Sequence, residues 1–361
     1  MIYFGYLNSE ERKRIFFKEP ESFNIDSERD ILQYAVGALL YVPAIKSELL
    51  DKCLNGNVTG MTSFVICLED SVGLKGEEEA VLNLSNFLTS LKNRDYQDNP
   101  LIFIRPRDVK QFKRISSIVE ENKEIISGIV IPKANGDKII SIFNILNDID
   151  CRNLYVMPII ETDDFIKERS KNECLEKFYI SIREYRDRIL NVRLGVTDIL
   201  GIYGVRRDKK FNIYDNLIFN KFSLEMLTMM NELNIPVSGC VSEFYDMEDQ
   251  TIFDSYVNEI RLDKFNGFCG KTVIHPMQLK IVQAMSVINY EDYIDAIDII
   301  NNIESKHAIT ASINKERMNE VNPHLKWARK ILRLSKIYGV FNKGMDYYEL
   351  YRLSLQYWYI R

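Results

Sequence analysis

The chain has 361 residues, of which 46% are hydrophobic and 27% are charged, and its formal net charge is −5. It contains 16 glycines and 9 prolines, too few for a collagen-like or low-complexity chain. The negative net charge argues against a general nucleic-acid-binding protein, because such proteins present a basic face.

Three further features predict a reduced, cytoplasmic protein. No two of the six cysteines have a C-x-x-C spacing, which argues against a zinc knuckle and a secreted disulfide framework. The amino-terminal segment carries charges from Glu10 onward and lacks the apolar core of a signal peptide. No apolar stretch reaches the ~18 residues that a membrane-spanning helix needs.

Residues 1–35 are polar and charged, and we expect them to form an arm before the main domain. Short apolar runs follow the arm at intervals along the chain. Continuous apolar runs are typical of strands that are covered on both faces, as in parallel sheets. The eight runs are Ala38–Val42, Ser63–Leu68, Leu101–Ile104, Gly128–Ile131, Leu154–Ile160, Val192–Val196, Ile235–Val241 and Thr272–Ile274.

The segments between these runs repeat apolar residues at intervals of three and four, which predicts helices. Eight strand–helix repeats predict a (β/α)8 TIM barrel over residues 36–290. A doubly wound open sheet shows the same alternation, but the count of eight and the chain length favour the barrel. The clearest helical segments are Ile45–Leu54, Gly76–Leu91, Lys110–Glu121, Asp137–Leu146 and Leu217–Leu233.

Residues 291–361 are predicted to form a C-terminal helical extension. A helix is expected from Pro323, because proline is favoured in a first helical turn. The chain then ends in an aromatic tail, which we expect to pack on the barrel or on a neighbouring subunit. The tail includes Tyr347, Tyr348, Tyr351, Tyr357, Trp358 and Tyr359.

Polar residues directly follow six of the eight apolar runs, at the strand ends where TIM barrels place catalytic groups. Converging carboxylates repel one another unless a cation joins them, and hard oxygen ligands suit Mg²⁺ or Mn²⁺. An arginine among them offers a fork for a substrate carboxylate. Such a set supports enolate chemistry, and with it the cleavage or formation of a carbon–carbon bond. The residues are Glu69, Asp70, Arg105, Lys133, Glu161, Asp198 and His275.

Eight short segments, spread in order from Leu39 to about Leu332 over some four-fifths of the chain, resemble the motifs of the HpcH/HpaI aldolase–citrate lyase superfamily, which includes citrate lyase β subunits and malyl-CoA lyases. The charged arm and aromatic tail are more similar to a divergent branch, the C–C bond lyases of the TIM-barrel fold, which is associated with tellurium-resistance gene clusters. The segments include LLYVPA (39–44), VICLEDSVGLKGEE (65–78), GIVIPKA (128–134), MPIIET (157–162), LGVTDIL (194–200), GFCGKTVIHPMQL (267–279) and ERMNEVNPHLKWARKIL (316–332).

The resemblance implies a Mg²⁺-dependent lyase or aldolase that acts through an enolate on a 2-oxo acid or an acyl-CoA. It implies that Glu161 and Asp198 bind the metal and that Arg105 binds the substrate. Glu69 and Asp70 match an acidic pair that organises the site in that family.

The remaining candidates are Lys133, Glu320 and His275. Lys133 is predicted either to bind substrate or to pair with a carboxylate. Glu320 stands where the family has an aspartate acid/base that reaches into a neighbouring subunit, so a homotrimer or hexamer is implied. His275 lies in a segment that is mainly structural in the family.

Two alternatives to the lyase stay open. The first is a CoA-thioester hydrolase on the same metal site, and the second is a non-catalytic homologue that binds a metabolite or a partner protein. The sequence lacks the family arginine before residue 39, which weakens the case for a CoA ester, and it has Ala44 in place of a family glycine. We expect a small-molecule substrate and neither nucleic acid nor a membrane as partner.

Overall fold

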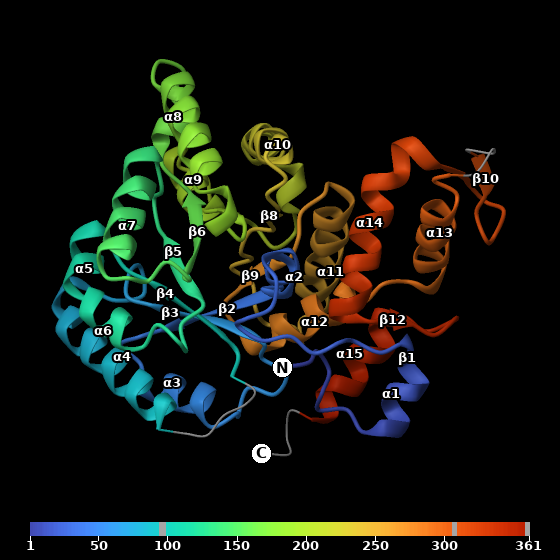
Figure 1. Cartoon of the computed structure of the whole chain (residues 1–361), viewed down its shortest axis with the longest axis horizontal. Helices are drawn as coiled ribbons and strands as arrows, with labels where there is room; N and C mark the ends of the chain where they lie inside the picture. Colours follow the sequence, from blue (N-terminus) through green and yellow to red (C-terminus); the bar gives the residue numbers. More distant parts are fainter. Residues whose placement is uncertain (94–98, 305–308, 358–361) are drawn as a thin grey trace.

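A barrel of parallel strands lies at the centre of the computed structural model, which describes residues 1–93, 99–304 and 309–357 (Figure 1). Its strands pair in the order β8-β7-β6-β5-β4-β3-β2-β9, and a parallel bridge between Gly239 and Lys271 brings the two edges of this sheet together. The predicted TIM barrel is therefore confirmed. The strands are β2 (Ala38–Pro43), β3 (Ser63–Cys67), β4 (Leu101–Arg105), β5 (Gly128–Ile131), β6 (Tyr155–Ile160), β7 (Val192–Leu194), β8 (Val237–Ser238) and β9 (Lys271–Val273).

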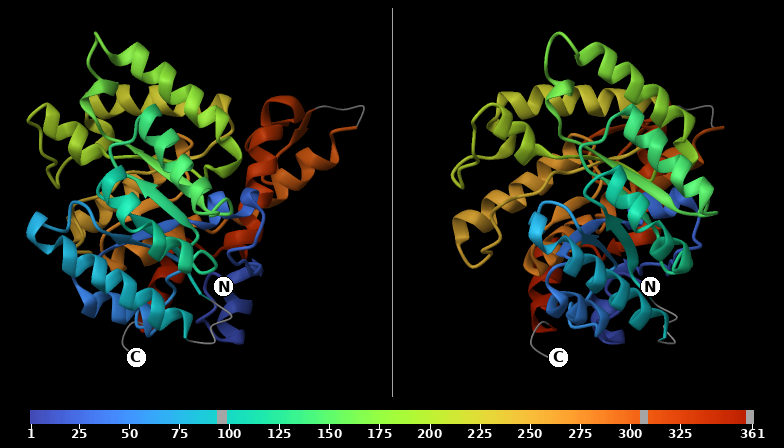
Figure 2. Two further views of the ribbon diagram at one scale, coloured as in Figure 1. Left: turned by 60° about the vertical axis from the view of Figure 1, so that its left-hand side comes forward. Right: turned by 90° about the vertical axis from the view of Figure 1, so that its left-hand side faces the viewer.

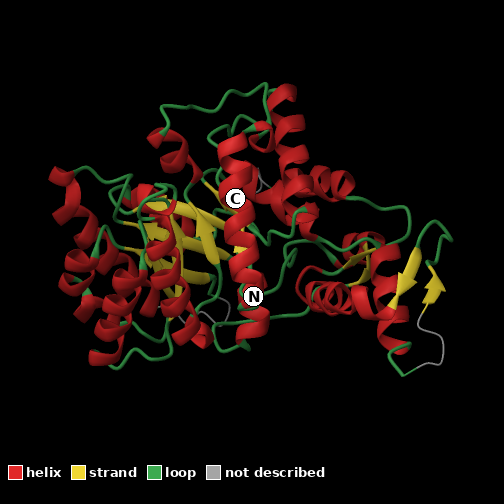
Figure 3. Ribbon diagram, turned by 90° about the horizontal axis from the view of Figure 1, so that it is seen from above, coloured by secondary structure: helices red, strands yellow, loops and turns green. Residues whose placement is uncertain are grey.

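Helices surround the strands, as the view from above shows (Figure 3). Every residue of β3, β4 and β5 is buried, which is why these strands are continuous apolar runs without alternation. The helices of the barrel are α3 (Ser47–Leu54), α4 (Glu77–Lys92), α5 (Val109–Arg114), α6 (Ser116–Glu121), α7 (Gly136–Asp148), α8 (Lys171–Glu184), α9 (Val196–Ile202), α10 (Leu217–Glu232), α11 (Gln250–Phe265) and α12 (Pro276–Ser286).

One predicted helix differs in the structure. The segment Lys110–Glu121 forms two helices, α5 and α6, that meet at Ile115. Ile115 is fully buried and has a ψ of 4°, which interrupts the regular helical backbone there. Its burial in the core continues the apolar periodicity of the sequence across the break.

The amino-terminal arm and the C-terminal extension pack against each other. The arm contains α1 (Ser9–Ile15), β1 (Phe16–Lys18) and α2 (Arg29–Ala35), and β1 pairs in antiparallel fashion with β12 (Val340–Phe341). The Tyr3 ring also lies 4.6 Å from that of Tyr338, centroid to centroid. The two ends of the chain therefore form one substructure beside the barrel.

A helical hairpin of α13 (Tyr290–Asn301) and α14 (Val321–Tyr338) projects from this substructure, at the right of Figure 1 and the upper right of the left view in Figure 2. A small core between the two helices contains Ala296, Ile299 and Ala328. Strands β10 (Ile309–Ala311) and β11 (Met318–Glu320) pair at its tip.

The aromatic tail packs on the chain's own barrel and arm. Helix α15 (Tyr347–Gln356) lies against α12, and the Tyr351 ring lies 5.4 Å from that of Phe253 on α11. The Tyr357 ring contacts that of Tyr6 at 5.3 Å. Trp358 and Tyr359 lie outside the described residues. Among the described residues, no helix combines the length and the apolar character that crossing a bilayer requires.

Truncation of a buried side chain on α15, the helix of the aromatic tail that packs against α12, is expected to destabilise the whole fold. Leu350 on α15 is 0% exposed, so Leu350→Ala should cost about 2–5 kcal/mol of unfolding free energy. Urea unfolding followed by circular dichroism measures this loss. The matched control is Leu82→Ala on α4, where the side chain is 58% exposed and the expected change is within about 0.5 kcal/mol. Equal stabilities of the two variants would contradict the packing of α15.

Candidate active site

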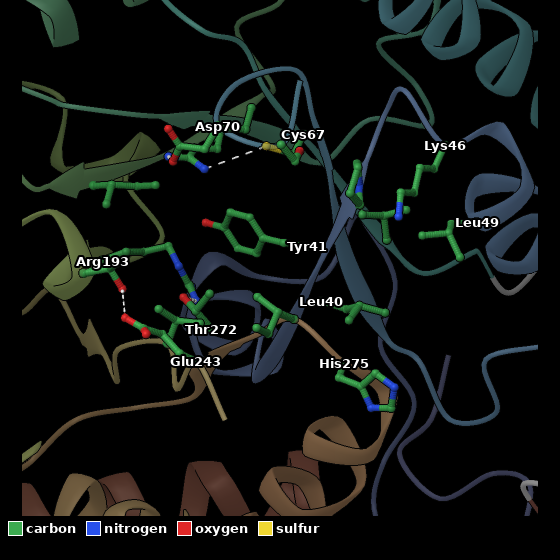
Figure 4. Close-up of a pocket in the computed structure, with 18 of the residues that line it drawn as sticks. Leu40, Tyr41, Lys46, Leu49, Cys67, Asp70, Arg193, Glu243, Thr272 and His275 are labelled. Atoms are coloured by element: carbon green, nitrogen blue, oxygen red, sulfur yellow. Dashed lines mark hydrogen bonds and ion pairs between the residues drawn. The ribbon is translucent and has the colours of Figure 1, made fainter. Parts of the chain in front are cut away.

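A cavity of about 880 Å³ lies at the carboxyl ends of the barrel strands and reaches into the barrel (Figure 4). Parallel strands of one barrel all point the same way, so the residues that follow them meet at one end. The cavity wall includes Asp70 after β3, Arg105 of β4, Glu161 after β6, and Asp198 on α9. With His275 at its edge, five of the candidate residues therefore share one cavity.

Arg105 holds three carboxylates together. Its Nη2 lies 2.6 Å from Glu69 Oε2, 3.0 Å from Asp70 Oδ2 and 3.6 Å from Glu161 Oε1. The guanidinium and both glutamates are buried, whereas Asp70 is exposed. Ion pairs that are withheld from water are strong and fix the positions of their members.

Lys133 connects this cluster to β5. Its Nζ donates a hydrogen bond to Glu69 Oε1, and its backbone N–H donates one to Glu161 Oε1 at 2.7 Å. Lys133 has a φ of +47°, a left-handed conformation that is uncommon outside glycine. The bend allows one residue to contact both glutamates. The structure thus shows the ion pair that the sequence left as one of two roles for Lys133.

Glu161 and Asp198 occupy environments that disfavour negative charge. Burial raises the pKa of Glu161 to about 7; Arg105 opposes this shift and the charge of Asp198 adds to it. Burial, and after it the charge of Asp70, raise the pKa of Asp198. A cation between these side chains would relieve both the burial cost and the repulsion.

Gly195, at the end of β7, provides the space for Glu161. A Cβ on Gly195 would lie 2.1 Å from Glu161 Oε2 and 2.4 Å from Glu161 Cβ. Gly195→Ala therefore forces Glu161 or α9 to move, and we expect a loss of about 1–3 kcal/mol in unfolding free energy.

The control for this prediction is Gly201→Ala in α9, where a new Cβ would meet nothing within 4 Å. Alanine is favoured over glycine in a helix, so this variant should be as stable as the parent or up to about 1 kcal/mol more stable. Thermal unfolding of the two variants checks the difference. Equal melting temperatures would contradict the close packing of Glu161 on Gly195.

The other two candidates have different surroundings. His275 lines the cavity edge, where its Nδ1 accepts a hydrogen bond from the Met277 N–H at 3.3 Å and caps α12. Glu320 lies at the end of β11 and directly precedes α14, away from the cavity residues. Its predicted role in a neighbouring subunit stays a prediction.

Two residues of the cavity were not predicted from the sequence. Tyr41 of β2 places its ring 5.7 Å from the Arg105 guanidinium, centroid to Cζ. Arg193 of β7 lies inside the barrel and contacts Thr272. Both sit within predicted strands, so the rule that searches strand ends did not reach them. The signal for Arg193 was a single charge inside an otherwise apolar run.

The carboxylates fit a divalent cation, though only with further ligands. In the described part of the chain, no group of three or more His, Cys, Asp or Glu side chains is placed to hold a metal ion. A cation here would bind the oxygens of Glu161 and Asp198 and complete its shell with water and substrate. Mg²⁺ commonly binds proteins in this manner, through one or two carboxylates.

Comparison with known proteins identifies the fold and the family. A family model described as the C–C bond lyases of the TIM-barrel fold matches residues 30–340. No curated protein matches the sequence.

Solved structures with the same barrel are also found. CitE of Mycobacterium tuberculosis, in complex with magnesium, acetoacetate and coenzyme A, is 16% identical, with a TM-score of 0.58 over 84% of this chain and 99% of that chain. Malate synthase of Haloferax volcanii, in a magnesium/glyoxylate complex, is 13% identical, with a TM-score of 0.54 over 67% of this chain and 72% of that chain. At these identities the likeness shows a shared fold.

Proposed function

Because the chain belongs to the C–C bond lyases of the TIM-barrel fold, we propose that this carbon–carbon lyase is Mg²⁺-dependent and acts on a 2-oxo acid or an acyl-CoA through an enolate. The observation that carries the proposal is the convergence of Arg105, Glu161 and Asp198 on one cavity. The magnesium and oxo-acid complexes of CitE and malate synthase support the choice of metal and substrate class.

The metal would be held by Glu161 and Asp198. When bound, Mg²⁺ supplies a Lewis acid that polarises a carbonyl group and favours enolate formation. The burial of Glu161 strengthens its attraction for a cation, because little water competes there.

Arg105 would orient the substrate. Its Nη2 is engaged by carboxylates, but its buried Nε has no hydrogen-bond partner among the described residues. A buried donor without a partner is costly, and a substrate carboxylate would satisfy it. Glu69, itself held by Lys133, keeps the guanidinium in place for this contact.

One substrate separates the lyase from the hydrolase alternative. Malyl-CoA cleaved at its carbon–carbon bond yields acetyl-CoA and glyoxylate, whereas hydrolysis yields malate and a free thiol. With Mg²⁺ we expect cleavage of the carbon–carbon bond of malyl-CoA or of a 4-hydroxy-2-oxo acid, and after removal of the metal by a chelator we expect no cleavage. The proposal would be overturned if malyl-CoA released its thiol and neither compound gave a carbon–carbon cleavage product.

A further inference from the structure

Arg193 is a buried guanidinium that faces the cavity from inside the barrel. It is the middle residue of β7, paired with Ile159 of β6 and Ser238 of β8, and it is 2% exposed. It lines the cavity together with Tyr41 and Thr272 (Figure 4). Arg193 therefore lies deeper in the barrel than the strand-end carboxylates.

Among the described residues, only neutral groups contact this guanidinium. Its Nη2 donates to Thr272 Oγ1 at 2.7 Å and its Nη1 donates weakly to Asn191 Oδ1 at 3.4 Å. Tyr41 provides a further side-chain hydrogen bond, while burial raises the pKa of that phenol and keeps it neutral. The Nε of Arg193 has no hydrogen-bond partner in the described part of the chain.

The contrast with the other buried arginines is clear. Arg105 pairs with three carboxylates, and Arg207, whose side chain is 5% exposed, pairs with Glu259. Within residues 1–93, 99–304 and 309–357, no carboxylate lies within ion-pair distance of Arg193. An arginine keeps its charge even when buried, so Arg193 places an uncompensated positive charge beside the cavity.

Such a charge is costly to the folded protein. A buried cation without a counter-ion destabilises a fold, and an anion that reaches it removes that cost. The planar fork of a guanidinium matches the two oxygens of a carboxylate. A cavity of about 880 Å³ has room for a small organic acid that spans the cavity from the strand ends to Arg193.

We propose that Arg193 forms an anion subsite for a second carboxylate, so that the cavity takes a dicarboxylate whose 2-oxo acid end lies at Arg105, Glu161 and Asp198. The subsite rests on the proposed function, because that function supplies the position of the reacting end. Tyr41 separates the two guanidinium groups, with its ring next to Arg105 and its hydroxyl hydrogen-bonded to Arg193. The Arg193 subsite thereby favours substrates that carry a negative charge at the end distant from the 2-oxo group.

Two acids of equal chain length test the subsite. 2-Oxoglutarate carries the distal carboxylate, and 2-oxovalerate lacks it. Isothermal titration calorimetry with Mg²⁺ should show that the parent binds 2-oxoglutarate about 10- to 100-fold more tightly, as one charge-assisted buried contact predicts. Equal affinities would overturn the subsite and leave the proposed function standing. If neither acid binds, the subsite is overturned, whereas the proposed function is tested separately by the cleavage of malyl-CoA.

Substitution of Arg193 assigns the preference to this residue. Arg193→Met should bind 2-oxoglutarate only as tightly as 2-oxovalerate, and its affinity for 2-oxovalerate should equal that of the parent. The melting temperature of the ligand-free variant should be higher than that of the parent, because the buried charge is gone. Arg193→Lys keeps the cation without the fork, so it should retain only part of the preference and provides a second variant if the first does not fold. A full preference in either variant would overturn the assignment.

Discussion

Arg105→Met is expected to destabilise the metal-free protein by about 3–5 kcal/mol at pH 8, because it leaves buried carboxylates without their counter-charge. The Arg105 guanidinium lies within 3.6 Å of both buried glutamates, Glu69 and Glu161, and the lysine Nζ that contacts Glu69 compensates only one of them. The loss should shrink at pH 5. Burial raises the pKa of Glu161 to about 7, so this carboxyl is protonated there and needs no partner.

Urea unfolding at the two pH values measures this loss. Arg206→Met is the matched control, because the Arg206 side chain is 91% exposed and its removal should change stability by no more than about 0.5 kcal/mol. Arg105 does not hold the carboxylates together if Arg105→Met loses as little unfolding free energy as the control. The same conclusion follows if its loss of unfolding free energy is equal at pH 5 and pH 8.

Glu161→Gln is expected to lower Mg²⁺-dependent turnover by at least about 10²- to 10³-fold while the chain stays folded. Glutamine keeps the size of the side chain and an oxygen that accepts the Lys133 N–H, so the local packing survives. It removes the negative charge that a cation needs. Steady-state kinetics with and without Mg²⁺ checks this loss, and turnover at the parent level would show that the metal lies elsewhere.

The same variant has a pH signature in the metal-free state. The folded protein raises the pKa of Glu161 from 4.5 to about 7, mainly through burial, so it binds the proton more tightly than the unfolded chain does. Ionisation of Glu161 therefore costs stability as the pH rises from about 4.5 to about 7.

Glutamine does not ionise, so the stability of Glu161→Gln relative to the parent should increase across this window, by up to about 3 kcal/mol, and level off above it. Thermal unfolding in the presence of a chelator measures this difference. A difference that is constant from pH 5 to pH 8 would contradict the buried, charge-disfavouring environment of Glu161.

The barrel was predictable from the sequence because its strands are covered on both faces. Burial of all residues in a strand such as β3 demands a continuous apolar run, and the spacing of eight such runs limits the possible folds. The break at Ile115 was not predictable, because Ile115 continues the apolar period of the flanking helices and nothing in the sequence marks a change of direction. Periodicity reports which face is buried and not whether the backbone is continuous.

The site was predictable only where it follows strand ends. Parallel strands bring Asp70, Arg105, Glu161 and Asp198 to the same cavity, so their order along the chain sufficed. Arg193 and Gly195 could not be found in this manner. The side chain of Arg193 matters because it lies inside the barrel, and Gly195 matters because Glu161 fills the space above it. Both depend on contacts between residues that are far apart in the sequence, Arg193 with Thr272 and Gly195 with Glu161, and the sequence alone does not show which residues meet.

The measurement that tests the account most directly is proton exchange of pyruvate, oxaloacetate and acetyl-CoA in D2O, followed by the loss of their methyl or methylene signals in NMR. Enolate formation at the proposed metal site predicts exchange with at least one of these compounds. The exchange should require Mg²⁺ and disappear in Glu161→Gln. No exchange with any of the three, or exchange that continues unchanged in Glu161→Gln, would contradict enolate chemistry at this site.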